Sequence, residues 1–529
     1  MTTSQEPTVP IATTGGRGRS RRRVARLPAL LAVPLVLAGV FAVERFGPDD
    51  GAAGDDVASS QSAAQRSLMP VASPPGSLSS TWFCAAGTGT GDGIADHTVV
   101  IANPTADPVT ATVTVFAGTI DTDPNAAHVA QQPPVARSVE VAANARASLR
   151  LADVVGAPFV SAMVEAPGGD LVVEHQVSGD RGADTGPCAS AASPSWHFAS
   201  GSTNREAQQL LVLFNPFPDD AVVDITFATT EGFRAPQPYN GFIVPGGRVV
   251  ALDVSAVVAR HDDVSASVIA RRGRLVADRI QVYGGFRGSG LAVGLGQPQL
   301  AQLLFFPSGG SADGLTERFL VYNPGRQPAQ LDIEIYLDNP EVNGEVEPVA
   351  VTVQPQSFFA VELSGEARVP SGVAHSAIVR VHNGIPVAVE RESFGDDPSP
   401  RRGVAITPGS PLLADTWVLA AGEASGAIGE TVTLFNPTLD EGISRVRVVP
   451  LDGSGQEVPS LAELEVPPGG RLTVNLADHL NSETLALRVE GTQPIVVERS
   501  LTRLGGRGMS QSLGVPLVRT IVRPPPIEG

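Results

Sequence analysis

Apolar and polar residues alternate over short stretches of the chain, and each stretch ends at a turn. Residues 210–227, LLVLFNPFPDDAVVDITF, begin with an apolar run, break at Asn-Pro, and continue with Val223, Ile225 and Phe227 alternating with polar residues. A period of two is typical of a strand with one buried face. Proline lacks the N–H that a sheet ladder needs, and an asparagine side chain can close an Asx turn. The stretch therefore predicts two strands joined at an Asn-Pro corner.

The same corner occurs four times. Its asparagines follow one another at intervals of 112, 108 and 113 residues: Asn103, Asn215, Asn323 and Asn436. Three further markers keep the same order and period: an upstream one such as WFCAAG (82–87), a downstream turn such as VPPGGR (466–471), and a closing one such as PIVVER (494–499). Four markers in constant order indicate that one module has been duplicated in tandem.

A repeat of about 110 residues made of short strands and turns favours a two-layer antiparallel sandwich, because propeller blades and solenoid repeats are shorter. The sequence thus predicts an all-β fold of four tandem immunoglobulin-like antiparallel β-sandwich modules, arranged as beads on a string. Repeats 1 to 4 span residues 80–192, 193–302, 303–414 and 415–521, and residues 522–529 form a tail.

The N-terminal segment has the composition of a membrane anchor. Six arginines between residues 17 and 26 precede LPALLAVPLVLAGVFAV, an uncharged run over residues 27–43 that is just long enough to cross a bilayer. The positive-inside rule places the arginines in the cytoplasm. We expect an Arg-rich cytoplasmic tail (1–26), a single-pass transmembrane signal-anchor (27–46) and a disordered linker (47–79), with the rest of the chain extracellular. The alternative is a signal peptide cleaved near Ala42, which leaves a secreted protein.

The two cysteines of the chain are Cys84 and Cys188, one near each end of repeat 1. An even pair that brackets one module of an exported protein predicts a disulfide. The bond would fasten the module nearest to the membrane.

One acidic residue recurs in the closing marker of every repeat: Glu174, Asp278, Glu390 and Glu498. A residue present in every copy usually serves the fold, so we interpret these carboxylates as structural, satisfied by backbone N–H groups or by an arginine on a neighbouring strand. The tryptophans Trp82, Trp196 and Trp417 also keep a fixed place in the repeat, which favours core positions over sugar-stacking platforms.

Composition excludes several chemistries. All 37 basic residues are arginine, so neither a Schiff-base lysine nor a P-loop lysine exists. A formal net charge of −18 disfavours nucleic-acid binding. The eight histidines are dispersed without the spacing of a zinc site, and no Gly-x-Ser-x-Gly elbow occurs. We therefore predict no catalytic residue, no metal, no other cofactor and no nucleic-acid partner.

Together, the anchor, the linker and the repeated modules resemble a family of uncharacterised actinobacterial cell-envelope proteins. Members of that family have one N-terminal hydrophobic segment and a secreted β-rich region of unknown function. The resemblance rests on the LFNP corners and the IVVER closing marker, and it extends over about residues 20–520. It implies an envelope location and transfers no catalytic or binding residue.

These observations predict a non-catalytic, membrane-anchored extracellular scaffold or interaction protein of the bacterial cell envelope, whose partner is an envelope protein or a cell-wall glycan. Two alternatives remain. A carbohydrate-binding protein of the wall predicts a surface with exposed aromatic residues and carboxylates. An extracellular hydrolase predicts a cluster of His, Ser or acidic residues that one repeat has and the others lack.

Overall fold

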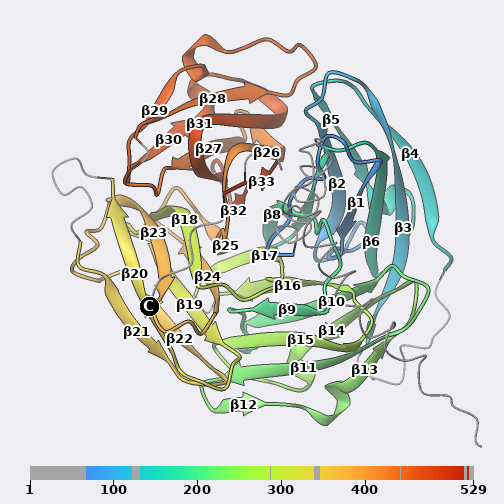
Figure 1. Cartoon of the computed structure of the whole chain (residues 1–529). Helices are drawn as coiled ribbons and strands as arrows, with labels where there is room; N and C mark the ends of the chain where they lie inside the picture. Colours follow the sequence, from blue (N-terminus) through green and yellow to red (C-terminus); the bar gives the residue numbers. More distant parts are fainter. Residues whose placement is uncertain are drawn as a thin grey trace, which may run out of the picture. The chain divides into compact units, whose positions relative to one another are not determined.

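The alternating segments of the sequence form β-strands in the computed structural model (Figure 1). In residues 329–337, for example, Leu331, Ile333 and Ile335 are buried, whereas Asp332 and Glu334 between them are partly exposed. The prediction of an all-β protein is confirmed, because the described residues contain strands and short 3-10 turns and no α-helix.

The structure describes residues 67–121, 132–285, 287–338, 346–440 and 442–517, and the backbone of residues 521–522. The predicted tail (1–26), the signal-anchor (27–46) and most of the linker lie outside these residues. Within them, no helix is both long and apolar enough to cross a membrane.

Repeats 1 and 2 form strands β1 to β17. Those of repeat 1 are β1 (Ser79–Cys84), β2 (Asp96–Asn103), β3 (Val109–Asp121), β4 (Val135–Val141), β5 (Ala145–Arg150), β6 (Phe159–Pro167), β7 (Val172–Gly179) and β8 (Gly182–Pro187), with a 3-10 turn at Leu151–Asp153. Those of repeat 2 are β9 (Ser195–Phe198), β10 (Ala207–Asn215), β11 (Ala221–Thr229), β12 (Gly232–Arg234), β13 (Asn240–Val244), β14 (Arg248–Asp253), β15 (Val264–Arg272), β16 (Val276–Gly284) and β17 (Ser289–Leu295), with 3-10 turns at Gln237–Tyr239 and Val254–Ala256.

Repeats 3 and 4 form strands β18 to β34. Those of repeat 3 are β18 (Leu303–Gly310), β19 (Leu315–Asn323), β20 (Ala329–Leu337), β21 (Val349–Val353), β22 (Ser357–Glu362), β23 (Ala374–Val381), β24 (Ala388–Gly395) and β25 (Gly403–Pro408). Those of repeat 4 are β26 (Leu413–Ala424), β27 (Ile428–Phe435), β28 (Ser444–Pro450), β29 (Leu464–Val466), β30 (Arg471–Asn475), β31 (Ser482–Arg503), β32 (Met509–Leu513), β33 (Val515–Pro516) and β34 (Ile521–Val522), with 3-10 turns at Pro459–Leu461 and Leu476–Asp478.

Strands pair in the same order in every repeat. One sheet, which we call the axial sheet, has the orders β5-β2-β7-β8, β14-β10-β16-β17, β22-β19-β24-β25 and β30-β27-β31-β32. The other, the flanking sheet, has the orders β4-β3-β6-β1, β12-β11-β15-β9 with β13 beside β11, β21-β20-β23-β18 and β29-β28-β31-β26. In repeat 4 the 22-residue strand β31 runs through both sheets.

The two sheets of a repeat enclose apolar side chains between them. In repeat 3, one cluster contains Phe319 and Val321 from the axial sheet together with Leu331, Ile333 and Val379 from the flanking sheet. The three tryptophans are buried in the cores, and Trp196 and Trp417 donate their indole N–H groups to the carbonyls of Leu275 and Ile495. Buried rings of this kind offer no platform for stacking a sugar.

The repeats contact one another extensively, so the predicted arrangement of separate modules, as beads on a string, is wrong. Strand β3 of repeat 1 pairs in parallel with β14 of repeat 2, which merges two sheets into one of eight strands. At the centre of Figure 1, the last strand of each axial sheet contacts that of the next repeat: β8 with β17, β17 with β25, and β25 with β32. Strand β32 in turn contacts β8, so the four repeats form a closed cycle.

Part of the predicted disordered linker also belongs to the fold. Met69, Val71 and Ala72 are buried. The Val71 N–H donates to Ser190 Oγ at 3.0 Å, and the Ala72 N–H donates to the Pro516 carbonyl at 3.1 Å. This segment contains the short apolar run LMPVA, whereas the residues before it are mostly polar. The apolar side chains can be buried against repeats 1 and 4.

Candidate functional site

Each axial sheet ends in a strand at the centre of the cycle (β8, β17, β25 or β32), and the closing marker lies on the strand that pairs with it. It places an acidic and a basic residue side by side on β7, β16, β24 and β31: Glu174 and His175, Asp278 and Arg279, Glu390 and Arg391, and Glu498 and Arg499. Successive side chains of a strand point to opposite faces of its sheet. The acidic and the basic side chain therefore face two different neighbours, and all eight are buried.

Between repeats 2 and 3, Arg279 and Glu390 form a two-pronged ion pair. Arg279 Nη1 lies 2.9 Å from Glu390 Oε2, and Nη2 lies 3.1 Å from Oε1. The backbone N–H and the hydroxyl of Ser200 also donate to Glu390 Oε2, at 2.7 and 2.9 Å. The carboxylate is thus surrounded by donors from repeat 2, which is the arrangement that a buried charge requires.

The same link recurs at the next two seams. Between repeats 3 and 4, the Arg391 guanidinium contacts Glu498, whose Oε2 accepts the Ser308 N–H at 3.1 Å. Between repeats 4 and 1, Arg499 Nη2 donates to Glu174 Oε2 at 2.9 Å, and the Ala421 N–H donates to the same oxygen at 2.8 Å. This last link joins residues 325 positions apart and closes the cycle.

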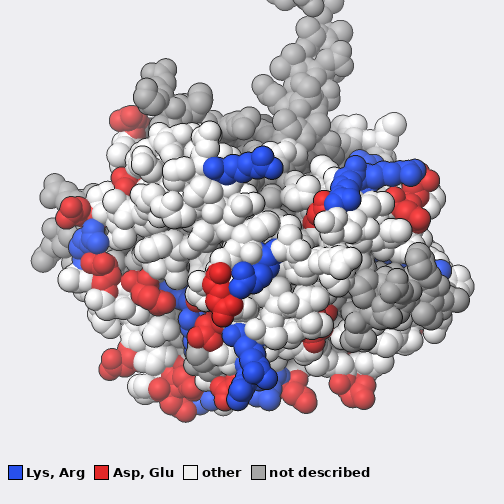
Figure 2. Space-filling model, turned by 90° about the horizontal axis from the view of Figure 1, so that it is seen from below, with Lys and Arg blue, Asp and Glu red and all other residues white. Residues whose placement is uncertain are grey.

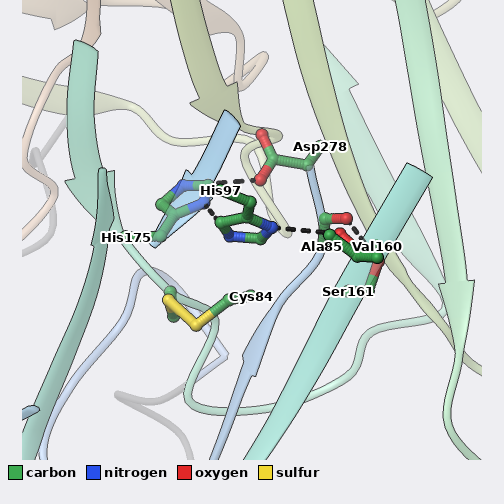
Figure 3. Close-up of a disulfide and its surroundings, with 8 residues drawn as sticks. Cys84, Ala85, His97, Val160, Ser161, His175 and Asp278 are labelled. Carbon is green, nitrogen blue, oxygen red and sulfur yellow. Dashed lines mark hydrogen bonds and ion pairs between the residues drawn. A yellow bond between two sulfur atoms is a disulfide. The ribbon is translucent and has the colours of Figure 1, made fainter. Parts of the chain in front are cut away.

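The link between repeats 1 and 2 is built differently, because histidine replaces arginine (Figure 3). His175 Nε2 lies 3.7 Å from Asp278 Oδ2, too far for a hydrogen bond. On its other side, His175 Nδ1 lies 3.1 Å from His97 Nε2, and His97 Nδ1 donates to the Val160 carbonyl at 3.0 Å. Burial lowers the pKa of His97 to about 4 and that of His175 well below its usual value, so both histidines are neutral.

The upstream and closing markers of one repeat therefore lie together at the seam, against the closing marker of the next repeat. At each seam, repeat n supplies the basic side chain and a backbone N–H from the WxxAxG marker or its equivalent, and repeat n+1 supplies the carboxylate. The carboxylates have partners of the kind that the sequence suggested, but these partners belong to the adjacent repeat. The basic residue that follows each carboxylate could have indicated these contacts between repeats. An acidic and a basic side chain that occur together in every copy can pair with the opposite charge of the copies on either side.

A second buried network at the seam of repeats 2 and 3 was not indicated by the sequence. Arg318 Nη2 donates to Asp263 Oδ1 at 2.6 Å, and Arg318 Nε donates to Glu392 Oε2 at 2.5 Å. Arg287 also contacts Asp263, at 2.6 Å. These residues are not shared by the four repeats, so no periodic pattern marks them.

Asp278 carries a proton under mildly acidic conditions. Burial is the main reason that its pKa is raised to about 7, although backbone N–H groups and Arg279 act in the opposite direction. Between about pH 3.8 and 7 the unfolded chain is ionised at this position while the folded chain is protonated, so the folded protein binds more protons. Its contribution to stability is therefore lost as the pH rises through this range.

We expect Asp278→Asn to become progressively more stable than the wild type as the pH rises. Asparagine resembles the protonated acid and does not have to ionise, so the free energy of unfolding of the variant relative to the wild type should increase by about 1.4 kcal/mol per pH unit between pH 5 and 7. Urea denaturation at pH 5, 6 and 7 measures this difference. A difference that does not change with pH would show that Asp278 is ionised throughout.

The corner asparagines are buried and form Asx turns. In each corner, the asparagine Oδ1 accepts a hydrogen bond from the N–H of the residue two positions later, as Asn215 does from Phe217 at 3.1 Å. Their Nδ2 groups donate to the carbonyl at the other end of the corner and to a carbonyl of the downstream marker. For Asn215 these are Asp219, at 2.9 Å, and Val244, at 3.0 Å, and the equivalents of Asn103, Asn323 and Asn436 are made in the same way. The corner is therefore a structural device that fastens two turns together.

Asn215→Ala should lower the free energy of unfolding by about 1–3 kcal/mol, because it leaves the Val244 carbonyl buried without a donor. Chemical denaturation measures the loss. Asn204→Ala is a suitable control, since this more exposed asparagine makes its side-chain contacts at the surface. Equal stabilities of the two variants would contradict the structural role of the corner.

The predicted disulfide is present. Cys84, the last residue of β1, is bonded to Cys188, which directly follows β8, and both are buried. Figure 3 shows the bond beside the His97–His175 pair. It ties the flanking sheet of repeat 1 to the strand at the centre of the cycle.

No open site for chemistry is visible in the buried cycle. Among the described residues, no group of three or more His, Cys, Asp or Glu side chains is arranged to hold a metal ion. A small apolar cavity of about 60 Å³ lies at the centre, lined by Met69, Pro187, Leu295, Pro408 and Leu513 among others. The four links can hold the repeats together, and they are too buried to meet a substrate.

Comparisons with known proteins point to a family without an assigned role. The model of a family of unknown function (DUF5719) matches residues 165–304 and 289–515, which together make up more than half of the chain. No curated protein matches the chain in sequence. Among solved structures, the chain is similar to a Thermotoga maritima protein (1070) at 18% identity, over 21% of this chain and 95% of that one, with a TM-score of 0.18. A likeness this distant carries no argument about this chain.

Proposed function

Because the chain belongs to this family of unknown function (DUF5719), we propose its role from its own geometry: it is a rigid, non-catalytic scaffold that presents binding surfaces at the cell envelope. Each repeat acts as an immunoglobulin-like sandwich, and the N-terminal segment anchors the assembly to the membrane. The observation that carries the proposal is the closed cycle of buried links, Arg279–Glu390, Arg391–Glu498, Arg499–Glu174 and His175–Asp278.

Rigidity is the property that such a cycle provides. Domains joined by short linkers usually move relative to one another unless their interface is extensive. Here every repeat has two neighbours, and a rotation at any of three seams would separate a buried carboxylate from its arginine. Since an unpaired buried charge is strongly unfavourable, the outer edges and loops of the repeats are held at fixed positions. Fixed positions suit a protein that binds a partner through several surfaces at once.

Two features support an extracytoplasmic location. Disulfides persist in oxidising compartments, and the Cys84–Cys188 bond lies in the first repeat after the predicted anchor. The run at residues 27–43 follows an arginine cluster, as in single-pass anchors. On the face shown in Figure 2, arginines lie among acidic side chains on a largely uncharged surface, an appearance more typical of a protein-binding surface than of a nucleic-acid-binding one.

The two alternatives gain no support from the described residues. The tryptophans that suggested sugar stacking are buried. The histidines that one repeat has and the others lack, His97 and His175, are also buried and contact each other and Asp278. Neither set of side chains is accessible to a polysaccharide or to a hydrolysable substrate.

The test is to identify what the full-length protein touches in the cells that produce it. The full chain with a C-terminal affinity tag is crosslinked in intact cells, purified and analysed by mass spectrometry, with an untagged strain as the control. We expect the same few envelope proteins to be enriched in every replicate. If purified cell wall is recovered with the protein and no protein is enriched, the glycan-binding alternative replaces the scaffold. If neither is recovered, the scaffold proposal is wrong.

A further inference from the structure

An open cavity of about 480 Å³ lies between repeats 3 and 4, outside the buried cycle. Its walls come from β18 of repeat 3, from β27, β30 and β31 of repeat 4, and from the segment before β25. Two arginines, Arg401 and Arg471, line it, and none of its described lining residues is acidic. In a chain with a formal net charge of −18, a cavity with this lining is unusual.

Hydroxyl groups form most of the remaining polar lining. They belong to Ser308, Thr431, Thr433, Thr473, Ser500 and Thr502. Those of repeat 4 are cross-strand neighbours on one face of the axial sheet: Thr431 pairs with Ser500, and Thr433 with Thr473. Because hydroxyls both donate and accept hydrogen bonds, this wall can donate to an anion as well as bind water.

Arg471 is only partly neutralised. Its Nη1 donates to Asp338 Oδ2 at 3.0 Å and its Nη2 to Thr473 Oγ1 at 2.9 Å, whereas its buried Nε has no acceptor. The equivalent arginine at the next seam, Arg146 of repeat 1, donates across that seam to backbone carbonyls. Its Nη1 donates to the carbonyls of Ala420, Gly422 and Leu485, which closes that seam. Arg471 makes no such contact among the described residues.

Arg401 forms no ion pair with any described residue. No carboxylate of the described residues lies within 4 Å of its guanidinium group, and its buried Nε has no hydrogen-bond acceptor. The nearest acids have other partners: Glu317 lies 2.8 Å from His375, and Glu498 contacts Arg391. Burial, and then Arg391, lower the pKa of Arg401, but arginine remains protonated in proteins. Arg401 therefore lines the cavity without an ion pair of its own among the described residues, and Glu317 and Glu498 act on it only from a distance.

Arg401 also breaks the repeat pattern. It stands two residues before the first residue of the central strand β25. Each repeat has an Arg-Gly pair at the start of its central strand, and Arg401 directly precedes this pair in repeat 3. At the position before the pair, the other repeats have Asp180, Phe286 and Gly506. A residue shared by all copies usually serves the fold, as the buried links do. Arg401 occurs at this position once and forms no ion pair within the described part of the chain, which suits a contact with a ligand better than a structural link.

We propose that the cavity between repeats 3 and 4 binds a small oxyanion group, such as the phosphate of a phosphate ester, through Arg401 and Arg471 and the surrounding hydroxyls. The guanidinium group can donate two parallel hydrogen bonds to such an anion, and both of these arginines line the cavity. The cavity is larger than inorganic phosphate alone, so there is room for the group that carries the anion. The proposal does not depend on the scaffold role.

Isothermal titration calorimetry of the purified full-length protein tests the site. The probes are inorganic phosphate, sulfate, glucose 6-phosphate and, as the uncharged reference, glucose, all at constant ionic strength. We expect saturable binding of the phosphate-containing probes and none of glucose. Tighter binding of glucose 6-phosphate identifies a phosphate ester as the preferred source, whereas equal affinities identify the free ion.

Arg401→Gln is the test variant, and Arg402→Gln is the matched control. Arg402 is adjacent in sequence, pairs with Asp397 and does not line the cavity. Arg401→Gln should weaken phosphate binding at least tenfold and leave the thermal midpoint of the ligand-free protein nearly unchanged, because no ion pair with a described residue is lost. Arg402→Gln should bind as the wild type does. No saturable binding by any anion, or equal binding by both variants, overturns the proposal.

Discussion

Replacing Arg391 with alanine is expected to lower the free energy of unfolding by about 3–5 kcal/mol. The substitution removes the guanidinium group that Glu498 contacts and leaves this buried carboxylate with little more than the Ser308 N–H. Breaking one partner of a buried pair is strongly destabilising, because the remaining charge has lost its solvation and its counter-ion. Urea denaturation, followed by circular dichroism, measures the loss.

Two controls separate the charge effect from simple loss of volume. The double substitution Arg391→Met with Glu498→Leu removes both charges and keeps apolar volume, so it should restore much of the stability. Arg234→Ala removes an arginine whose ion pair with Glu231 is exposed, and it should have little effect. If the double variant is as unstable as Arg391→Ala, the cycle is held together by packing and not by matched charges.

Substituting both cysteines, Cys84→Ala with Cys188→Ala, is expected to cost about 4–5 kcal/mol. The bond closes a loop between residues 104 positions apart, and in the chain-entropy model a loop of this size restricts the unfolded chain strongly. The thermal midpoint of unfolding should therefore fall, and the reduced wild type should behave like the variant.

Reductant provides the internal control for this prediction. The described residues contain no free cysteine, so a reducing agent should lower the midpoint of the wild type and leave that of the double variant unchanged. A wild type that is equally stable with and without reductant would contradict the expected stabilisation. It would indicate that the closed cycle already restricts repeat 1 as much as the bond does.

Local structure could be predicted from the sequence because its causes are local. Alternation in residues 331–337 reflects one buried face, and the Asn-Pro corner at residue 215 is closed by hydrogen bonds within a few residues. The pairing of Cys84 with Cys188 also follows from a count, since two cysteines in one repeat have a single way to pair. These features need no knowledge of where distant segments lie.

Assembly of the repeats could not be predicted in the same way. The contact between Arg499 and Glu174 depends on the angle between successive repeats, and that angle accumulates from side-chain packing at every seam. A period of about 110 residues suits a straight chain of modules and a closed cycle equally well. The buried segment at Met69 was overlooked for a related reason, since its contacts lie on repeats that are far away in the sequence.

The candidate anion site shows a further limit. Arg401 is one of 37 arginines, and its neighbour Arg402 has an ordinary partner at the surface. Only the structure shows that, among the described residues, Arg402 has an ion-pair partner and Arg401 has none. A comparison of the four copies could have drawn attention to Arg401, because the other repeats have no basic residue at that position.

Closure of the cycle also determines when the protein can finish folding. During synthesis each repeat has its own two sheets to form, and the seams between repeats 1 and 2, 2 and 3, and 3 and 4 can follow in order. The seam of repeats 4 and 1 has to wait for the last part of the chain, because Arg499 lies 325 residues after Glu174. Until then Glu174 has no counter-ion and the central edge of repeat 1 is open. A nascent chain of this protein therefore keeps an exposed edge strand for most of its synthesis, a period in which protection from aggregation matters most.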